Sequence, residues 1–338
     1  MALDGFGNEA GPACLVARVQ SGPFVAVKST GFMNSHYLCY KTLVNGRRSM
    51  SKMSLNTPIL QHVFHPTDFS PESDIAFAHA LKAALIAKAT LTMLHVSSGE
   101  EQDWMEFPGI RQTLERWGLL PKNSPRSAVP ELGINVRKVI TKEKDPVKSV
   151  LGFLEQQPTD LIVLATHQDK GRGQWQEKSV AQPLARKSRQ MTLFVPAGVK
   201  GFVSFQDGVV SLKNIVIPVA QVPNAQPAIQ AAVRIAQQLN CPTGRFTVLH
   251  VGDGSSMPEL DCPELPGWEW SRLSQVGDII EVILQTARTT EADLIVMSTE
   301  GHNGFLDALR GSHSEKVLWQ CACPLLAIPA QSWVSSVL

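Results

Sequence analysis

The sequence predicts an α/β protein with two tandem, open parallel sheets, each carrying helices on both faces. Strand-like apolar runs alternate with helical patterns, and uninterrupted runs such as residues 161–165 are typical of parallel strands that are covered on both faces. The second half of the chain also repeats the order of the first. Thr92-Met-Leu-His-Val96, for example, is matched by Thr247-Val-Leu-His-Val251. One design is therefore used twice.

Composition excludes several classes of protein. The chain has 338 residues and 43% hydrophobic content, enough for two ordinary domains. Its formal net charge of +1 gives no electrostatic basis for a dedicated nucleic-acid or membrane-surface binder. No apolar run approaches the ~20 residues that a membrane span needs, and the N-terminus lacks the apolar core of a secretory signal. We therefore expect a cytoplasmic protein with neither nucleic acid nor membrane as a partner.

The cysteine and histidine patterns do not favour a metal. The six cysteines include no CxxC pair, so they support neither a disulfide framework nor a zinc ribbon. Cys321-x-Cys323 is a weak metal pattern that buried, alternate residues at the start of a strand explain better. Glu300, His302 and His313 form a second weak pattern. We expect no metal cofactor.

Residues 1–56 differ from the rest of the chain. There is no acidic residue between Glu9 and Asp68, while several lysines and arginines occur there. Such a segment could act as an organelle transit peptide. Because the periodic pattern begins only after Met53, we favour a poorly ordered N-terminal extension, or translation from a start site chosen too early.

The first repeat covers residues 57–199. Ser70-Pro71-Glu72 predicts a helix start, with the serine as N-cap, proline at the first helical position and an acid in the first turn. The expected strands are residues 59–65, 91–96, 134–140, 161–165 and 192–196, and the expected helices start near Pro71 and cover about residues 109–117, 146–156 and 179–189.

The second repeat covers residues 212–330, after a connector over 200–211 and before a tail over 331–338. Its expected strands are residues 214–218, 247–251, 294–297 and a last strand ending at Pro329; its helices are 227–239 and 276–290. Asp207-Gly208 predicts a turn in a small connector hairpin. Equivalent residues are 152 positions apart at Pro66 and Pro218 but only 133 apart at Asp160 and Asp293. Repeat 1 therefore carries an insertion of about 19 residues between its second and fourth strands.

Several motifs together resemble the universal stress protein (UspA-like) family. They are Pro66-Thr-Asp-Phe-Ser70, Leu94-His-Val96, Asp160-Leu-Ile-Val-Leu-Ala-Thr-His167, and the Gly-x-x-Gly…Gly-Ser loop at 301–312. The resemblance covers about residues 57–199 and 212–330. It implies two tandem, open, five-stranded parallel sheets of the adenine-nucleotide α-hydrolase type, in which the last strands of the two copies pair. The chain would then form an intramolecular pseudo-dimer, either as a monomer or as a further homodimer.

The resemblance also implies a nucleotide site in repeat 1. Family members that bind ATP have a Gly-x₂-Gly-x₉-Gly-Ser/Thr loop and an aspartate after the first strand that holds the adenosine. Asp68 matches this aspartate, and Val96 occupies the place of a backbone contact to the base, but the glycine loop of repeat 1 is too short for the family spacing. The candidate nucleotide-binding residues of repeat 1 are Pro66, Thr67, Asp68, Val96, Thr166, Gly171, Gly173 and Ser179.

Repeat 2 is the weaker candidate site. Ala220 occupies the place of the aspartate, and the glycine spacing is again short. Residues 300–312 carry a formal charge of −1, whereas residues 167–179 carry +1, so a triphosphate should prefer repeat 1. The presence of serine at positions 179 and 312 is also explained by a helix capping box, which needs no ligand. The repeat 2 candidates are Val251, Gly301, Gly304, Gly311 and Ser312.

Motifs of known enzyme classes are missing from the sequence. It contains no Gly-x-Ser-x-Gly, no Gly-x₄-Gly-Lys-Ser/Thr and no His-Glu-x-x-His. His95 and His250, at equivalent places, are interpreted as packing or hydrogen-bonding residues. We expect a non-catalytic stress-response protein that binds ATP or AMP in at least one repeat as a sensor or regulator. The alternatives are a protein-interaction module with vestigial pockets and an unknown protein partner, and a slow ATP hydrolase.

Overall fold

The computed structural model describes residues 60–97, 106–143, 145–166, 190–299 and 321–329. The chain divides into two compact units, Met1–Pro58 and Ile59–Leu338, and every described residue belongs to the second. The predicted extension over 1–56, the helix over 179–189 and the tail over 331–338 lie outside the described residues.

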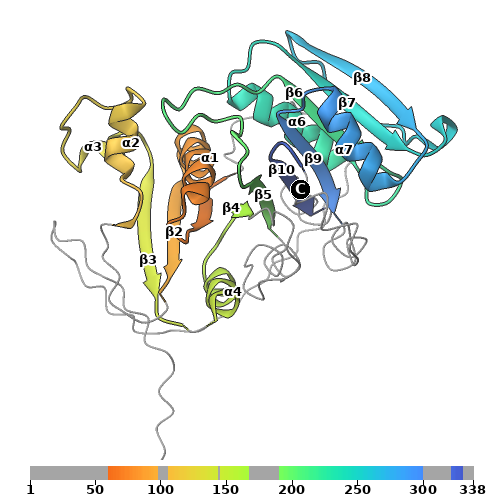
Figure 1. The fold of residues 1–338 in the computed structure, drawn as a ribbon. Coiled ribbons are helices and arrows are strands. Elements are labelled where there is room, and N and C mark those ends of the chain that lie inside the picture. Colours follow the sequence, from red (N-terminus) through yellow and green to blue (C-terminus); the bar gives the residue numbers. More distant parts are fainter. Residues whose placement is uncertain (1–59, 98–105, 144, 167–189, 300–320, 330–338) are drawn as a thin grey trace, which may run out of the picture. The chain divides into compact units, whose positions relative to one another are not determined.

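Ten strands form one sheet in the order β3-β2-β1-β4-β5-β10-β9-β6-β7-β8 (Figure 1). Strands within each repeat pair in parallel, and β5 pairs with β10 in antiparallel fashion. The predicted α/β class and the pairing of the last strands are therefore confirmed. The strands are β1 (His62–Pro66), β2 (Thr90–Val96), β3 (Asn135–Thr141), β4 (Leu161–Thr166), β5 (Met191–Pro196), β6 (Asn214–Val219), β7 (Gly244–Val251), β8 (Trp268–Gln275), β9 (Leu294–Thr299) and β10 (Leu325–Pro329).

Side-chain caps begin α1, α4 and α7. The Ser70 hydroxyl accepts a hydrogen bond from the backbone N–H of Ser73, and Pro71 is the first helical residue, as the sequence predicts. Asp145 and Asp278 cap α4 and α7 through backbone N–H groups of the first turn. The helices are α1 (Pro71–Ala87), α2 (Ile110–Arg116), α3 (Ala128–Glu131), α4 (Pro146–Gln156), α6 (Gln226–Gln238) and α7 (Ile279–Thr289), with a 3₁₀ turn η2 (Gly254–Ser256).

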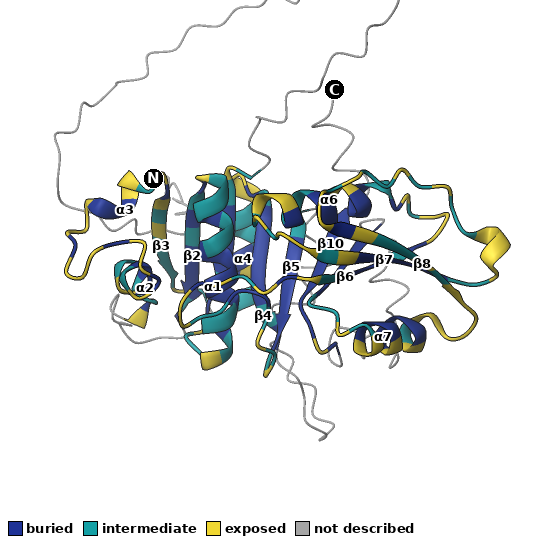
Figure 2. Ribbon diagram, turned by 90° about the horizontal axis from the view of Figure 1, so that it is seen from above, coloured by how far each residue is buried: buried dark blue, intermediate teal, exposed yellow. Residues whose placement is uncertain are grey.

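Two hydrophobic cores lie on opposite faces of the sheet. Apolar residues of α1 and α6 pack on one face, and those of α4 and α7 pack on the other. The central strands are buried along their length, whereas the outer strands β3 and β8 carry exposed residues (Figure 2). Burial on both faces explains why β4 and β9 have continuous apolar sequences.

The two repeats start their sheets with the same contact. Oδ2 of Asp160 accepts the backbone N–H groups of Gln61 and His62, at 2.8 Å each. Oδ2 of Asp293 accepts those of Lys213 and Asn214, at 2.7 and 2.9 Å. Each aspartate precedes the fourth strand of its repeat and fixes the start of the first strand. The repeated Asp-Leu-Ile-Val motif therefore has a structural cause.

The connector forms a small hairpin that packs on repeat 1. An antiparallel bridge joins Val203 to Val210, and Gly208 in the turn has φ = +69°. The imidazole Nε2 of His79 on α1 accepts the backbone N–H groups of Phe202 and Val203, at 3.1 and 3.2 Å. The connector is thus held by α1.

The repeat 1 insertion also contacts the connector. Arg116 and Trp117, at the end of α2, donate side-chain hydrogen bonds of 2.9 and 3.1 Å to the carbonyl oxygen of Phe205. Arg116 also donates to the carbonyl oxygen of Gln206 at 3.0 Å. The end of α2 is therefore engaged within the protein.

Some boundaries differ from the sequence-based expectations. β1 begins at His62 instead of residue 59, because its register is set by pairing with β2 and β4. The helix expected over 276–290 begins at Ile279, after the N-cap Asp278. β8 was not expected at all, although Trp268 and Trp270 pack on Phe246 at ring-centroid distances of 4.4 Å.

Candidate functional site

The candidate site lies at the carboxyl edge of repeat 1. The strand order reverses between β1 and β4, since β2 and β3 continue on one side and β5 on the other. In open parallel sheets, ligands bind in the crevice at such a switch point. Pro66 ends β1, and Thr166 ends β4. Asp68 follows two residues after β1, so the predicted residues Pro66, Asp68 and Thr166 all lie at this edge.

Asp68 is an exposed acidic group at this edge. Its Oδ1 accepts hydrogen bonds from the backbone N–H of Ser70 at 3.0 Å and from the Ser70 hydroxyl at 2.7 Å. A third bond, of 2.6 Å, comes from the hydroxyl of Ser73. These bonds hold the carboxylate against the first turn of α1 and fix its orientation.

Thr67, by contrast, serves the fold and does not present its side chain to a ligand. The residue is 6% exposed, and its Oγ1 accepts the N–H of Phe69 at 3.1 Å. Its own N–H donates to the carbonyl oxygen of Leu94 at 2.9 Å. The side chain of Thr67 therefore shapes the loop that carries Asp68.

His95 and His250 have equivalent roles in the two repeats. Nδ1 of His95 lies 2.8 Å from the carbonyl oxygen of Thr67, and Nδ1 of His250 lies 3.2 Å from that of Val219. Phe69, at φ = +61°, stacks on the ring of His95 with a centroid distance of 4.0 Å. Both imidazoles tie the end of the second strand to the end of the first, in line with the hydrogen-bonding interpretation.

His65 is a buried histidine that the sequence reasoning missed. Its Nδ1 donates to the carbonyl oxygen of Val163 at 2.8 Å. Complete burial lowers the pKa of His65 to about 4, so the ring is neutral at pH 7 and Nε2 is an acceptor. Among the described residues, this Nε2 has no hydrogen-bond partner. The signal was a polar residue in an otherwise apolar strand.

Thr166 and Val96 complete the described part of the edge. Thr166 is 1% exposed, and its Oγ1 lacks a hydrogen-bond partner within the described ranges. Its counterpart in repeat 2, Thr299, donates to the carbonyl oxygen of Ile328 at 3.4 Å. Val96 ends β2 and is half-buried, paired with Thr141 of β3. Among the described residues, the lack of a hydrogen-bond partner at the Thr166 hydroxyl thus distinguishes repeat 1 from repeat 2.

The corresponding edge of repeat 2 is built differently. Ala220 is exposed and offers no carboxylate. The next residue, Gln221, donates its side-chain N–H to the carbonyl oxygen of Ser256 at 3.2 Å, and the Ser256 hydroxyl lies 2.8 Å from Nε2 of His250. These contacts tie the loops after β6 and β7 to each other. Val251, the other described candidate, ends β7.

The glycine loops lie outside the described residues. This concerns Gly171, Gly173 and Ser179 of repeat 1, and Gly301, Gly304, Gly311 and Ser312 of repeat 2. The same holds for Glu300, His302 and His313. Within the described ranges, no group of three or more His, Cys, Asp or Glu side chains is placed to hold a metal ion.

Cys321 and Cys323 form a buried pair. Their sulfur atoms lie 3.6 Å apart, and the residues are 1% and 3% exposed. The hydrogen bond between the thiols lowers the pKa of Cys321 and raises the pKa of Cys323. Both cysteines are buried alternate residues just before β10, as the sequence analysis expects.

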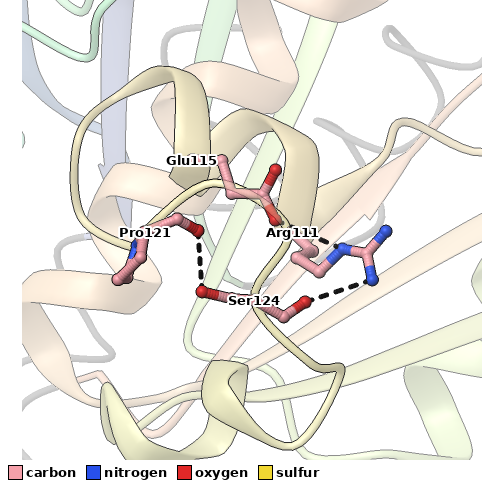
Figure 3. A network of polar contacts seen from close by, with 4 residues as sticks. All are labelled: Arg111, Glu115, Pro121 and Ser124. Carbon is pink, nitrogen blue, oxygen red and sulfur yellow. Dashed lines mark hydrogen bonds and ion pairs between the residues drawn. The ribbon is translucent and has the colours of Figure 1, made fainter.

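A polar network holds the repeat 1 insertion together (Figure 3). Arg111 and Glu115 of α2 form an ion pair of 3.5 Å, and Arg111 also donates to the carbonyl oxygen of Ser124 at 3.2 Å. The Ser124 hydroxyl donates to the carbonyl oxygen of Pro121 at 2.7 Å. These groups bond to one another within the insertion, so the network supports its fold.

No helix in the described part of the chain is long and apolar enough to cross a membrane.

Comparisons with known proteins agree with the fold and its duplication. Three solved structures match 80–83% of this chain and 96–98% of their own length. They are a universal stress protein from Archaeoglobus fulgidus DSM 4304 (15% identity, TM-score 0.50), a functionally unknown protein from Pseudomonas aeruginosa PAO1 (13%, 0.53) and a putative universal stress protein from Pseudomonas aeruginosa UCBPP-PA14 (12%, 0.53). At these identities the likeness concerns the fold.

A search of curated proteins gave no match. The family model described as the universal stress protein family matches residues 60–196 and 263–329, which is more than half of the chain. The two matched segments fall on the two halves of the ten-stranded sheet. The chain belongs to the universal stress protein family.

Proposed function

We propose that repeat 1 binds an adenine nucleotide, ATP or AMP, at the carboxyl edge of β1 and β4, and that the chain acts as a non-catalytic nucleotide sensor in the stress response. The observation that carries the proposal is the Asp68 carboxylate. It is exposed at the switch point of the sheet, and its Oδ1 is fixed by Ser70 and Ser73.

A fixed carboxylate suits a ribose. Its oxygens can accept hydrogen bonds from the sugar hydroxyl groups, the role that an acidic residue plays at the switch point of other nucleotide-binding sheets. Because Asp68 is already held by three hydrogen bonds, little side-chain entropy remains to be lost on binding. The buried Thr166 hydroxyl at the adjacent strand end supports a polar ligand at the same edge.

Repeat 2 lacks these features. Ala220 removes the carboxylate, and the bond from Gln221 to Ser256 joins the loops on which a nucleotide would lie. We therefore assign one nucleotide to repeat 1 and none to repeat 2.

The proposal includes binding without turnover. In the described part of the repeat 1 edge, Oδ1 of Asp68 is occupied by local donors, and Nδ1 of His65 and of His95 bonds to backbone carbonyl oxygens. These contacts favour a positioning role for the polar groups over proton transfer.

Calorimetric titration of the full chain with ATP and with AMP tests the proposal. Asp68→Asn keeps an acceptor for Ser70 and Ser73 but loses the charge, so nucleotide affinity should fall about tenfold or more. Asp253→Asn is the matched control, because Asp253 is an exposed cap at the carboxyl edge of repeat 2 and accepts the N–H of Ser255 at 3.1 Å.

Two outcomes would contradict this proposal. Absence of binding at millimolar nucleotide would leave the protein-interaction module as the better account. Steady phosphate release from ATP that Asp68→Asn abolishes would show an enzyme instead of a sensor.

A further inference from the structure

A second site lies at the opposite edge of the sheet from Asp68. Side chains between α1 and α6 surround a cavity of about 110 Å³. Its floor consists of leucines near the amino-terminal ends of the central strands, among them Leu161, Leu193, Leu294 and Leu326. Because Asp68 lies at the carboxyl edge, this cavity is distinct from the proposed nucleotide site.

The lining of the cavity is duplicated. Lys82 of α1 and Arg234 of α6 both line it, and they are 152 positions apart, like Pro66 and Pro218. The two leucine pairs, Leu161 with Leu294 and Leu193 with Leu326, are each 133 positions apart, like Asp160 and Asp293. Equivalent residues of the two repeats therefore face the same cavity, at the seam where β5 pairs with β10.

The cavity combines an apolar interior with two cations. Lys82 and Arg234 are half-buried, and burial lowers the pKa of both side chains. Of the described residues that line the cavity, none is Asp or Glu. Lys82 also lies over the Trp117 ring, 5.2 Å from its centroid, and Asp207 is the acidic group that acts on it. Partly desolvated cations beside apolar surface favour an anion with an apolar body.

We propose that this cavity binds a small amphipathic carboxylate, with its hydrocarbon part between α1 and α6 and its carboxylate facing Lys82 and Arg234. The volume sets the size of the ligand. A protein cavity of about 150 Å³ holds one benzene molecule, so about 110 Å³ suits a hydrocarbon part of about four or five carbons. Such a ligand contacts both repeats at once and would stabilise their junction.

Hexanoate and 1-hexanol are the probes, since each carries a short apolar chain and they differ in charge. Calorimetric titration of the full chain should show hexanoate binding about tenfold more tightly than hexanol. Lys82→Gln and Arg234→Gln should each weaken hexanoate binding several-fold while leaving hexanol affinity unchanged. Lys122→Gln, which removes an exposed lysine of the insertion, is the matched control and should change neither affinity.

Filling the cavity provides an independent test. Ala83 lines it and is half-buried, so Ala83→Leu should reduce the affinity for both probes. Asp68→Asn should leave hexanoate binding intact, which separates this site from the nucleotide proposal.

The proposal is overturned if hexanoate does not bind at millimolar concentration, or if hexanoate and hexanol bind equally. It is also overturned if the two glutamine variants lower stability without changing hexanoate affinity. That result would mean that the side chains of Lys82 and Arg234 only serve the packing of α1 and α6.

Discussion

The hydroxyl group of Ser73 lies 2.6 Å from Oδ1 of Asp68. Ser73 is buried in the first turn of α1, and Asp68 is exposed in the loop that precedes it. The helix start that Ser70 and Pro71 predict in the sequence therefore also orients the carboxylate of Asp68. Fold and site share these contacts, so mutations must be chosen to separate their effects.

Replacing Ser73 tests the orienting role directly. Ser73→Ala removes one charge-assisted hydrogen bond to Asp68, so unfolding free energy should fall by about 1–2 kcal/mol and ATP affinity several-fold. Denaturant titration and calorimetry measure the two effects.

Ser149→Ala is the matched control for this change. Ser149 is a buried serine near the start of α4, and its hydroxyl lies 2.7 Å from that of Thr141. It should lower stability by a similar amount and leave ATP affinity unchanged. Equal loss of affinity in both variants would show that Ser73 acts only through stability.

Buried histidines should make the protein sensitive to acid. Burial lowers the pKa of His79 from 6.5 to about 4, although the hydrogen bond from Nδ1 to the carbonyl oxygen of Ile75 acts in the opposite direction. Between pH 6.5 and about 4, His79 is therefore protonated in the unfolded chain but neutral in the folded chain. Stability is therefore complete above pH 6.5 and falls as the pH drops to about 4, by about 3 kcal/mol for this group.

His79→Gln checks this assignment, since the amide oxygen can accept the N–H groups of Phe202 and Val203 but does not titrate. Denaturant titrations from pH 7 to pH 4 should give a curve that is flatter than the wild-type curve by about 3 kcal/mol. His65, with its pKa lowered to about 4 by burial, should account for a similar remaining slope. Parallel curves for wild type and His79→Gln would exclude the role given to His79.

Gly208 should tolerate no side chain. Its φ is +69°, and a Cβ atom would overlap the ring of Trp117. Gly198 has a similar φ of +77°, but nothing lies within 4 Å of the place its Cβ would occupy. Thermal unfolding should show a cost of about 1 kcal/mol for Gly198→Ala and about 3 kcal/mol or more for Gly208→Ala. Similar costs would mean that the connector does not pack on Trp117 as described.

The two sheet-starting aspartates should contribute independently. Asp160→Asn and Asp293→Asn each weaken two charge-assisted bonds to backbone N–H groups, so each should cost about 1–3 kcal/mol. Because the two sites share no partner, the double variant should show the sum of the single effects in denaturant titration. A large departure from additivity would contradict the independence of the two sites.

Local and repeated signals made most of the fold predictable. The cap at Ser70, the apolar run of β4 and the repeated Asp-Leu-Ile-Val motif each have a local physical cause, and the structure contains all three. β8 was missed because Trp268 and Trp270 lie on an edge strand whose pairing with β7 comes from tertiary packing on Phe246.

The candidate site could be predicted only in part. Asp68 was predicted because it matches the aspartate that nucleotide-binding family members have after the first strand. The sequence cannot show that Ser73 holds Asp68 or that Thr67 turns its hydroxyl inward. The cavity between α1 and α6 was not foreseen, because Lys82 and Arg234 come together only when two distant helices pack on one sheet. Their equal spacing from Pro66 and Pro218 was visible, yet its meaning depends on the structure.

Hydrogen exchange with and without ATP, read by mass spectrometry of peptides, tests the nucleotide assignment most directly. The account predicts that ATP slows exchange in peptides covering residues 66–73 and the end of β2, and leaves residues 218–226 of repeat 2 unchanged. Protection confined to repeat 2, or absent from both edges at saturating ATP, would contradict it.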